Sequence, residues 1–316
     1  MSNSKPIQKV AIIGTGVIGE SWTALFLAKG LDVIATDIAP GAEAALRRFV
    51  DSAWPALKRL GLAPGASQAR LTFIADMPTA VKGVDLVQEN APERIDFKRK
   101  LYHQLDELLP AEVIIASSSS GLIMSEIQAD CRLHPERCVI GHPFNPPHLM
   151  PLVEVVGGKK TSEGTIQRAM EFYSRIGKKA VRLHKELPGH VANRFQAAVA
   201  REVYYLVAEG VLSAADADAA LSWGPGLRWG IMGNMMLNHL GGGPGGIEHF
   251  FHTGLRQLRR LRDSIHKFSL VHLNISSEVR PFMATVIPSQ CGKNFRWEKF
   301  SSRKNSYHQN IFARRE

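Results

Sequence analysis

A glycine-rich hexapeptide near the amino terminus constrains the fold of this chain more than any other feature. The sequence GTGVIG (14–19) has the pattern G-x-G-x-x-G and lies between an apolar run at 9–14 and a helical pattern at 17–30. In such a turn the first glycine allows the tight bend, the second lets the backbone approach a pyrophosphate, and the third lets helix and strand pack closely. We therefore expect a dinucleotide to contact Gly14, Gly16, Val17, Ile18 and Gly19.

An acidic residue ends the second apolar run at the place where such a site needs one. The run at 32–37 closes with Asp37, whose carboxylate is placed to accept hydrogen bonds from ribose hydroxyls. Its charge would repel the 2′-phosphate of NADP, and no arginine follows immediately to offset that repulsion. The backbone N–H groups that open the helix at 17–30 also favour a phosphate. The sequence thus predicts NAD as the cofactor.

Short β-branched runs alternate with longer helical patterns through the first part of the chain. Such alternation is typical of an α/β fold with a Rossmann-type doubly wound, mostly parallel sheet. Helices are expected at 17–30, after the strand at 32–37 as far as about residue 60, at 94–109 and at 163–177. Strands are expected at 9–14, 32–37, 71–75, 84–89, 111–118, 137–142, 151–156 and 178–183.

The alternation stops at Leu187-Pro188-Gly189, after which only helical patterns follow, at 190–210 and 213–223. We expect an NAD-binding domain at 1–187 and a smaller, all-helical substrate domain at 188–254. Past residue 254 alanine and glycine become scarce, and a basic tail of uncertain structure is expected at 255–316.

The distribution of charge excludes one class of partner. The net charge is +10, but residues 255–316 carry 13 Lys and Arg against 4 Asp and Glu. Residues 1–254 carry 26 and 25, so the main body is almost neutral and no nucleic-acid-binding surface is expected.

Membrane, secretion and metal signals are weak. We expect no membrane span and no secretory signal, because the start is polar and no run of eighteen apolar residues occurs. The three cysteines therefore suggest reduced thiols and a cytoplasmic protein. The spacing of Cys131, His134 and Cys138 offers one ligand fewer than structural zinc usually needs, so no metal is expected.

The stretch HPFNPPHLMPLVE (142–154) carries the strongest sign of catalysis. Oxidation of a secondary alcohol needs a base for the hydroxyl proton, and histidine suits this because its pKa lies near neutrality. Glu154 lies in an apolar strand, where an unpaired charge is expensive, so it should pair with His142. The alternative is a strand-end histidine and an edge glutamate that share no function.

Five motifs together give the chain a resemblance to a known family. GTGVIG, NAPERIDFK, SSSSGL, HPFNPPHLMPLVEVV and ELPGHVANR occur in order and spacing similar to those of the L-3-hydroxyacyl-CoA dehydrogenase family. Within it the chain resembles the short branch that contains carnitine 3-dehydrogenase, L-gulonate 3-dehydrogenase and lambda-crystallin. The resemblance covers about residues 8–250 and implies NAD-dependent oxidation of a 3-hydroxyl group.

The resemblance also implies roles for single residues. His142 matches the catalytic base and Glu154 its partner, while Ser120 and Asn193 match residues that contact the reacting oxygen. Asn145 matches a residue beside the nicotinamide. Glu93 and Lys98 match cofactor contacts, although without the resemblance solvated helix charges would be the favoured interpretation of both.

Three features depart from the family. His190 stands where the family usually has phenylalanine, and Asn234 stands where it has proline. The residues after 254 do not resemble the family, whose members complete the second domain and often a homodimer interface there. The resemblance implies a homodimer, whereas the altered ending argues against one.

The substrate is expected to be a small 3-hydroxy acid or a short 3-hydroxyacyl-CoA. The segment at 223–229 resembles the carnitine and gulonate branch, where Arg228 would bind a carboxylate and Trp223 and Trp229 would face a quaternary ammonium group. Both tryptophans are also compatible with a place in the core. The alternative function is an NAD-binding structural or sensing protein with little or no turnover.

Overall fold

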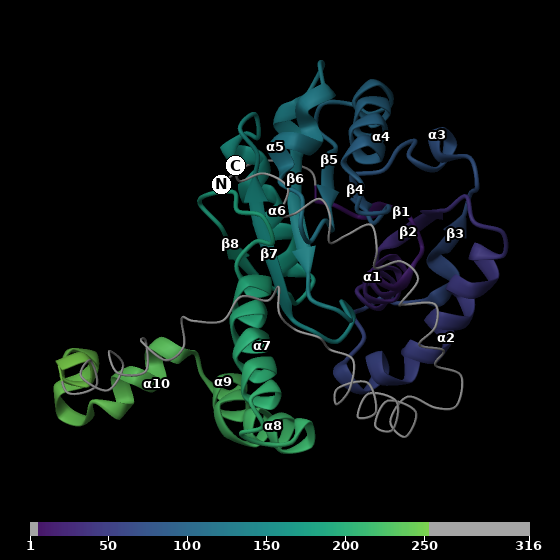
Figure 1. Ribbon diagram of the computed structural model, residues 1–316. Helices are drawn as coiled ribbons and strands as arrows, with labels where there is room; N and C mark the ends of the chain where they lie inside the picture. Colours follow the sequence, from purple (N-terminus) through teal and green to yellow (C-terminus); the bar gives the residue numbers. More distant parts are fainter. Residues whose placement is uncertain (1–5, 253–316) are drawn as a thin grey trace. The chain divides into compact units, whose positions relative to one another are not determined.

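The structure is a computed structural model that describes residues 6–252, and its amino-terminal part is built around one eight-stranded sheet (Figure 1). The strands run in the order β3-β2-β1-β4-β5-β6-β7-β8 across the sheet. Their bounds are β1 Lys9–Ile13, β2 Asp32–Thr36, β3 Leu71–Phe73, β4 Leu86–Glu89, β5 Ile114–Ser117, β6 Cys138–Pro143, β7 Leu152–Gly157 and β8 Lys179–Arg182.

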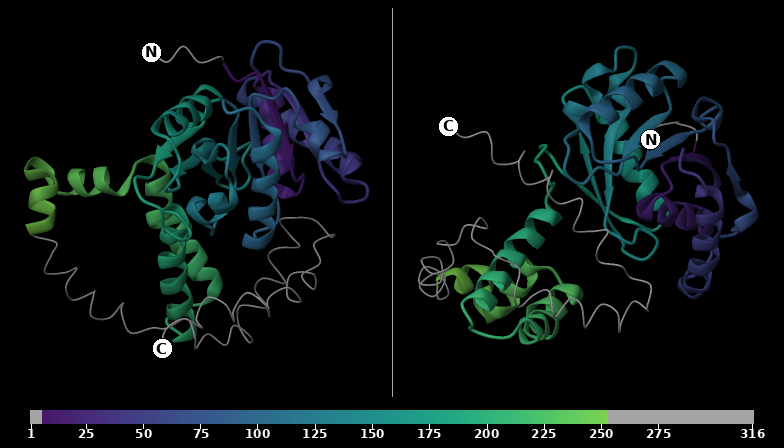
Figure 2. Two further views of the ribbon diagram at one scale, coloured as in Figure 1. Left: turned by 90° about the horizontal axis from the view of Figure 1, so that it is seen from above. Right: turned by 45° about the vertical axis from the view of Figure 1, so that its right-hand side comes forward.

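Helices cover both faces of the sheet (Figure 2). One face packs against α1 (Val17–Ala28), α2 (Ala42–Leu60) and α6 (Glu163–Arg175). The other packs against α3 (Met77–Ala80), α4 (Ile95–Leu108) and α5 (Met124–Ile127). Short 3-10 turns lie at Gln68–Arg70, Gln128–Asp130 and Pro135–Arg137.

Alternate side chains of each strand enter the two cores. Along β1, Val10 and Ile12 pack towards α1 and α2, whereas Ala11 and Ile13 pack towards α3 and α4. A strand buried on both faces must be apolar at nearly every position, which is why these strands are continuous apolar runs in the sequence. The predicted Rossmann-type, mostly parallel sheet followed by helices is confirmed.

One strand pair departs from the parallel order. β6 and β7 are antiparallel, while all other neighbouring pairs, including β7 with β8, are parallel. The register of β6 and β7 places His142 directly opposite Glu154. The carboxyl ends of β1, β2, β4, β5 and β6 lie at one edge of the sheet, where ligands of such folds bind.

The chain divides into two compact units after Phe195, which lies near the start of α7 (Ala192–Ala208). The second unit is helical in its described part, as expected. Besides the rest of α7 it holds α8 (Ala214–Leu221), a π-helical segment at Ser222–Gly226, α9 (Leu227–Ile231), α10 (Asn234–Gly241) and a 3-10 turn at Gly243–Gly245. The Ser213 hydroxyl caps α8 by accepting from the backbone N–H of Asp216. The expected basic tail at 255–316 lies outside the described residues.

Within residues 6–252 no helix has both the length and the apolar character needed to cross a bilayer.

Candidate active site

The glycine-rich turn lies between β1 and α1, and its three glycines meet different surroundings. Gly14 has a φ of +84°, and a Cβ there would lie 2.8 Å from the carbonyl oxygen of Asn90. A Cβ on Gly19 would lie 1.9 Å from the carbonyl oxygen of Gly14, so only glycine lets α1 pack this closely. A Cβ on Gly16 would meet nothing within 4 Å. The turn is thus closed towards the sheet and open at Gly16, which suits the close approach of a pyrophosphate.

Residues at the open side of this turn are accessible. Val17, the first residue of α1, is 62% exposed, and Ile18 is partly buried against the core. The backbone N–H groups at this end of α1 have no side-chain cap, so they are available to an anionic ligand.

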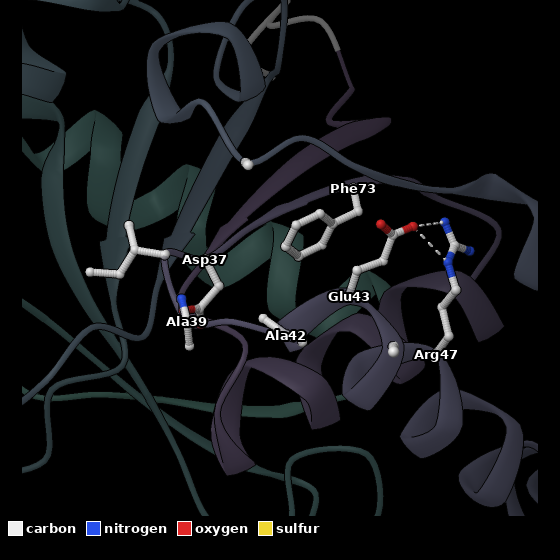
Figure 3. A pocket seen from close by; sticks show the side chains of 10 residues that line it. Asp37, Ala39, Ala42, Glu43, Arg47 and Phe73 are labelled. Atoms are coloured by element: carbon white, nitrogen blue, oxygen red, sulfur yellow. Dashed lines mark hydrogen bonds and ion pairs between the residues drawn. The ribbon is translucent and has the colours of Figure 1, made fainter.

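Asp37 lies just beyond the end of β2 and lines a pocket (Figure 3). One of its carboxylate oxygens accepts from the backbone N–H of Thr15 at 2.6 Å and from the Thr15 hydroxyl at 3.0 Å. The other accepts from the backbone N–H of Ala39 at 2.9 Å. The pocket, of about 740 Å³, is lined by Asp37, Ile38, Ala39, Gly41, Ala42, Glu43, Ala44, Arg47, Phe73 and Ala75. An acidic group at the end of an apolar hollow suits a ribose beside a flat base.

His142 and Glu154 form a buried pair across β6 and β7. The Nδ1 atom of His142 lies 2.9 Å from a carboxylate oxygen of Glu154. The other carboxylate oxygen accepts from the backbone N–H groups of Val191 and Ala192, both at 3.0 Å. Glu154 therefore connects the histidine to the first residues of α7.

The surroundings of Glu154 keep it ionised. Burial by itself would raise the pKa of Glu154, but the bonds from His142, Ala192 and Val191 hold the pKa below its ordinary value. An ionised carboxylate only accepts hydrogen bonds, so His142 must carry a proton on Nδ1. In a neutral ring with this tautomer, Nε2 carries the lone pair, which is the form that a general base needs.

Glu93 organises the segment that carries Ser120. One carboxylate oxygen of Glu93 accepts from the Ser119 hydroxyl at 2.6 Å and from the backbone N–H of Gly121 at 2.7 Å. It also accepts from the backbone N–H groups of Ser120 and Leu122. Glu93 thus fixes a loop, and Ser120 is exposed within it.

Asn193, in the first turn of α7, is tied to the same loop. Its Nδ2 donates to the carbonyl oxygen of Ser120 at 3.1 Å. Because Val191 and Ala192 bond to Glu154, the start of α7 brings Asn193 and Ser120 towards the His142–Glu154 pair. The structure therefore brings together the four residues that the resemblance assigns to catalysis.

Lys98 lies in α4 and is 1% exposed. Its Nζ lies 2.6 Å from a carboxylate oxygen of Glu89 and 3.8 Å from one of Glu93. Glu89 also accepts from the hydroxyl of Ser117 at 2.6 Å. Glu89 is a functional residue that sequence reasoning missed, although a charged residue in the apolar strand at 84–89 is the same signal that identified Glu154.

Asn145 is exposed in the segment 144–150, which joins β6 to β7. A buried lysine at the start of β8 supports this segment and was also missed by sequence reasoning. The Nζ of Lys178 donates to the carbonyl oxygens of Pro147 and Met150, the latter at 2.7 Å. Lysine close to a strand end is common, so its sequence position gives no signal of this contact.

The remaining sequence-predicted residues include three in the second unit. Trp223, Arg228 and Trp229 are exposed in the second unit. Cys131 and Cys138 are buried, whereas His134 is partly exposed and contacts Glu136. Among the described residues no group of three or more His, Cys, Asp or Glu side chains is placed to hold a metal ion.

Both parts of the chain match sequence models of known domain families. The sequence model of the 3-hydroxyacyl-CoA dehydrogenase NAD-binding domain matches residues 9–187. The model of the 3-hydroxyacyl-CoA dehydrogenase C-terminal domain matches residues 189–274, and so extends past residue 254.

Similar proteins include two bacterial enzymes and two solved structures. The chain is 49% identical to L-carnitine dehydrogenase of Streptomyces griseus, with 77% of this chain and 72% of the relative covered. It is 48% identical to L-carnitine dehydrogenase of Pseudomonas aeruginosa, with 79% and 78% covered.

Among solved structures, an NAD⁺-dependent dismutase, 5-formyl-3-hydroxy-2-methylpyridine 4-carboxylic acid 5-dehydrogenase, is 34% identical with a TM-score of 0.74, and 84% and 88% of the two chains are covered. The 3-hydroxybutyryl-CoA dehydrogenase of Escherichia coli is 29% identical with a TM-score of 0.61, over 66% of this chain and 44% of that one. With both family domains matched in order, the chain belongs to the 3-hydroxyacyl-CoA dehydrogenase family of NAD-dependent dehydrogenases.

Proposed function

We propose that this chain oxidises the 3-hydroxyl group of carnitine, or of a closely related small 3-hydroxy acid, with His142 as the base. The observation that carries the proposal is the buried His142–Glu154 pair, with 2.9 Å between Nδ1 and the carboxylate. The names of the relatives from Streptomyces griseus and Pseudomonas aeruginosa support carnitine as the substrate.

The proposed mechanism assigns one task to each residue of the cluster. NAD⁺, when bound, supplies the acceptor for the hydride that leaves C3 of the substrate. His142 takes the hydroxyl proton on Nε2, and Glu154 holds the ring and stabilises the imidazolium that forms. Ser120 and Asn193 position the reacting oxygen, so that the site is organised before the substrate arrives.

The proposed cofactor site extends along the carboxyl edge of the sheet. The backbone around Gly14, Gly16 and Gly19 holds the pyrophosphate, with Val17 and Ile18 at the start of α1 beside it. Asp37 accepts from the adenosine ribose in the pocket of Figure 3. Asn145 lies beside the nicotinamide. Glu93 contributes by holding the loop that carries Ser120, and Lys98 contributes from α4, where its Nζ lies 3.8 Å from the Glu93 carboxylate.

Substrate choice is assigned to the second unit. Arg228 suits a free carboxylate because its guanidinium group can bind both oxygens, and the faces of Trp223 and Trp229 suit a quaternary ammonium group. All three side chains are exposed and thus available to a ligand. A homodimer and a cytoplasmic location, which the sequence predicts, stay predictions.

The test follows NADH formation at alkaline pH with L-carnitine, L-gulonate and short L-3-hydroxyacyl-CoA substrates, alongside NAD⁺ binding. We expect turnover of L-carnitine, and a fall in kcat of roughly 100-fold or more in His142→Ala and Glu154→Gln, the range that general base catalysis contributes. Faster turnover of a 3-hydroxyacyl-CoA than of L-carnitine would show that the substrate is a thioester and not a small free acid.

The alternative function makes a different prediction for the same sample. NAD⁺ binding without turnover of any of these substrates would contradict the proposed enzyme and favour an NAD-binding structural or sensing protein. Equal NAD⁺ affinity in wild type and His142→Ala shows that the variant has kept its cofactor site.

A further inference from the structure

A second histidine lies against the proposed base. The rings of His142 and His190 have centroids 5.0 Å apart, and His190 is fully buried. The resemblance places His190 where the family usually has phenylalanine, so this chain has a titratable ring where an apolar one is usual. Nothing in the proposed mechanism uses it.

The contacts of His190 fix its tautomer. Its Nε2 lies 2.9 Å from the carbonyl oxygen of Ser119. A carbonyl oxygen only accepts, so Nε2 carries the proton and donates it. In the neutral ring Nδ1 is then an acceptor, and it has no hydrogen-bond partner within the part of the chain that the structure describes.

The backbone at His190 is held in a conformation that its residue type rarely adopts. Its φ is +52°, the single positive value at a non-glycine residue in the described chain. Such a conformation persists where surrounding contacts determine it, and it clusters at functional sites. The next two residues, Val191 and Ala192, donate to Glu154. One short stretch therefore bonds to the Ser119 loop and to the partner of His142.

We propose that His190 is a positioning residue for the reaction: as a neutral Nε2–H imidazole it ties the segment that carries Ser120 to the ring of His142. This inference rests on the proposed function, because it deepens the same site. The imidazole packs against the base, with the two ring planes tilted by 44°, while its N–H group donates to the Ser119 carbonyl. A phenylalanine in this place packs but leaves that carbonyl without this donor.

Burial of the His190 ring favours its neutral form, while the charged groups around it act in both directions. Three titratable groups face it: His142 from β6, Glu154 from β7, and Glu93 from the loop before α4. Burial is the largest influence and lowers the pKa of His190 below its ordinary value, although the bond to the Ser119 carbonyl and the carboxylates of Glu154 and Glu93 act in the opposite direction.

The first test reads the tautomer directly and needs no turnover. Long-range ¹H–¹⁵N spectra of the histidine rings in the full chain are followed from pH 5 to 9, with His190→Gln used to assign the His190 signals. We expect His190 to carry its proton on Nε2 and to stay neutral across this range. A proton on Nδ1, or protonation of the His190 ring within this range, would overturn the inference.

The second test compares two replacements with different losses. His190→Phe keeps a ring against His142 but has no donor, whereas His190→Gln keeps a donor for the Ser119 carbonyl. We expect His190→Phe to lower kcat about tenfold, as for one positioning hydrogen bond, with the KM for NAD⁺ unchanged. His190→Gln should recover most of that loss.

The control is His134→Gln, which changes a partly exposed histidine paired with Glu136 and should alter neither kcat nor the pH profile. A wild-type kcat in His190→Phe, or an equal fall in both His190 variants, would show a packing role only. If wild type turns over no substrate, the proposed function fails, and the tautomer measurement still decides the assignment of His190.

Discussion

At the scale of single residues, two glycines of the turn after β1 differ in the space around them: Gly19 is tightly packed and Gly16 is open. Gly19 packs with its Cα against the backbone of Gly14, while Gly16 faces open space. The first arrangement serves the packing of α1 on the sheet, and the second leaves room for a ligand. The same residue type is thus required at two positions for two different reasons.

Replacing each glycine by alanine separates these reasons. Gly19→Ala forces a Cβ into the Gly14 carbonyl, so we expect a loss of about 3 kcal/mol or more in unfolding free energy, as in overpacked cores. Gly16→Ala should unfold at nearly the wild-type temperature but bind NAD⁺ about tenfold more weakly, because the added methyl group fills the approach to the pyrophosphate. Thermal unfolding and calorimetric NAD⁺ titration check both, and undiminished NAD⁺ affinity in Gly16→Ala would contradict the assigned site.

Charged residues in buried strands show how far sequence reasoning reaches at this scale. His142 and Glu154 are paired in the structure as the sequence predicts, because a charge in an apolar strand demands a partner. The same rule applies to Glu89, but its partner Lys98 lies on a helix and was assigned to the cofactor instead. A charged residue in a buried strand predicts that a partner exists, but its position in the strand does not identify the partner residue.

At the scale of elements, the segment 144–150 is held to the elements on either side of it. The Ser21 hydroxyl on α1 accepts from the backbone N–H of His148 at 2.9 Å and lies 2.7 Å from its Nδ1. Lys178 donates to two carbonyl oxygens of the segment and lies over the ring of Trp22, 5.1 Å from its centroid. These contacts fix the connection that carries Asn145 between β6 and β7.

The stability that Lys178 contributes through these contacts depends on pH, because its ionisation does. Burial, with a smaller contribution from Lys29, lowers the pKa of Lys178 from its ordinary value of 10.5 to about 8. Between pH 8 and 10.5 the unfolded chain binds more protons at this lysine than the folded chain, so its contribution to stability rises with pH in that window. We expect the difference in unfolding free energy between wild type and Lys178→Met to shift in favour of wild type from pH 8 to 10.

Denaturant unfolding at several pH values measures this shift. Lys179→Met, which changes the exposed neighbouring lysine in β8, is the matched control and should show a pH-independent difference. A flat difference for Lys178→Met over the same range would mean that Lys178 keeps an ordinary pKa.

At the scale of the whole molecule, cofactor binding is coupled to stability. A ligand that binds only the folded chain raises the unfolding free energy by about 2.7 kcal/mol at 100 times its Kd. We therefore expect NAD⁺ to raise the thermal unfolding midpoint by several degrees. NADP⁺ at the same concentration should raise it less, because Asp37 lies at the end of the pocket where a 2′-phosphate would lie. An equal rise with both nucleotides would show that Asp37 does not select NAD⁺ over NADP⁺.

The sequence by itself determined the Rossmann-type sheet, the change to helices after residue 187, and NAD as the cofactor. These follow from patterns of adjacent residues: apolar runs, a glycine-rich turn and an acidic strand end. The tertiary structure decided which distant residues meet. It made β6 and β7 antiparallel, paired Glu89 with Lys98, and placed His190 on the ring of His142. Such contacts depend on how the chain closes on itself, so no local pattern records them.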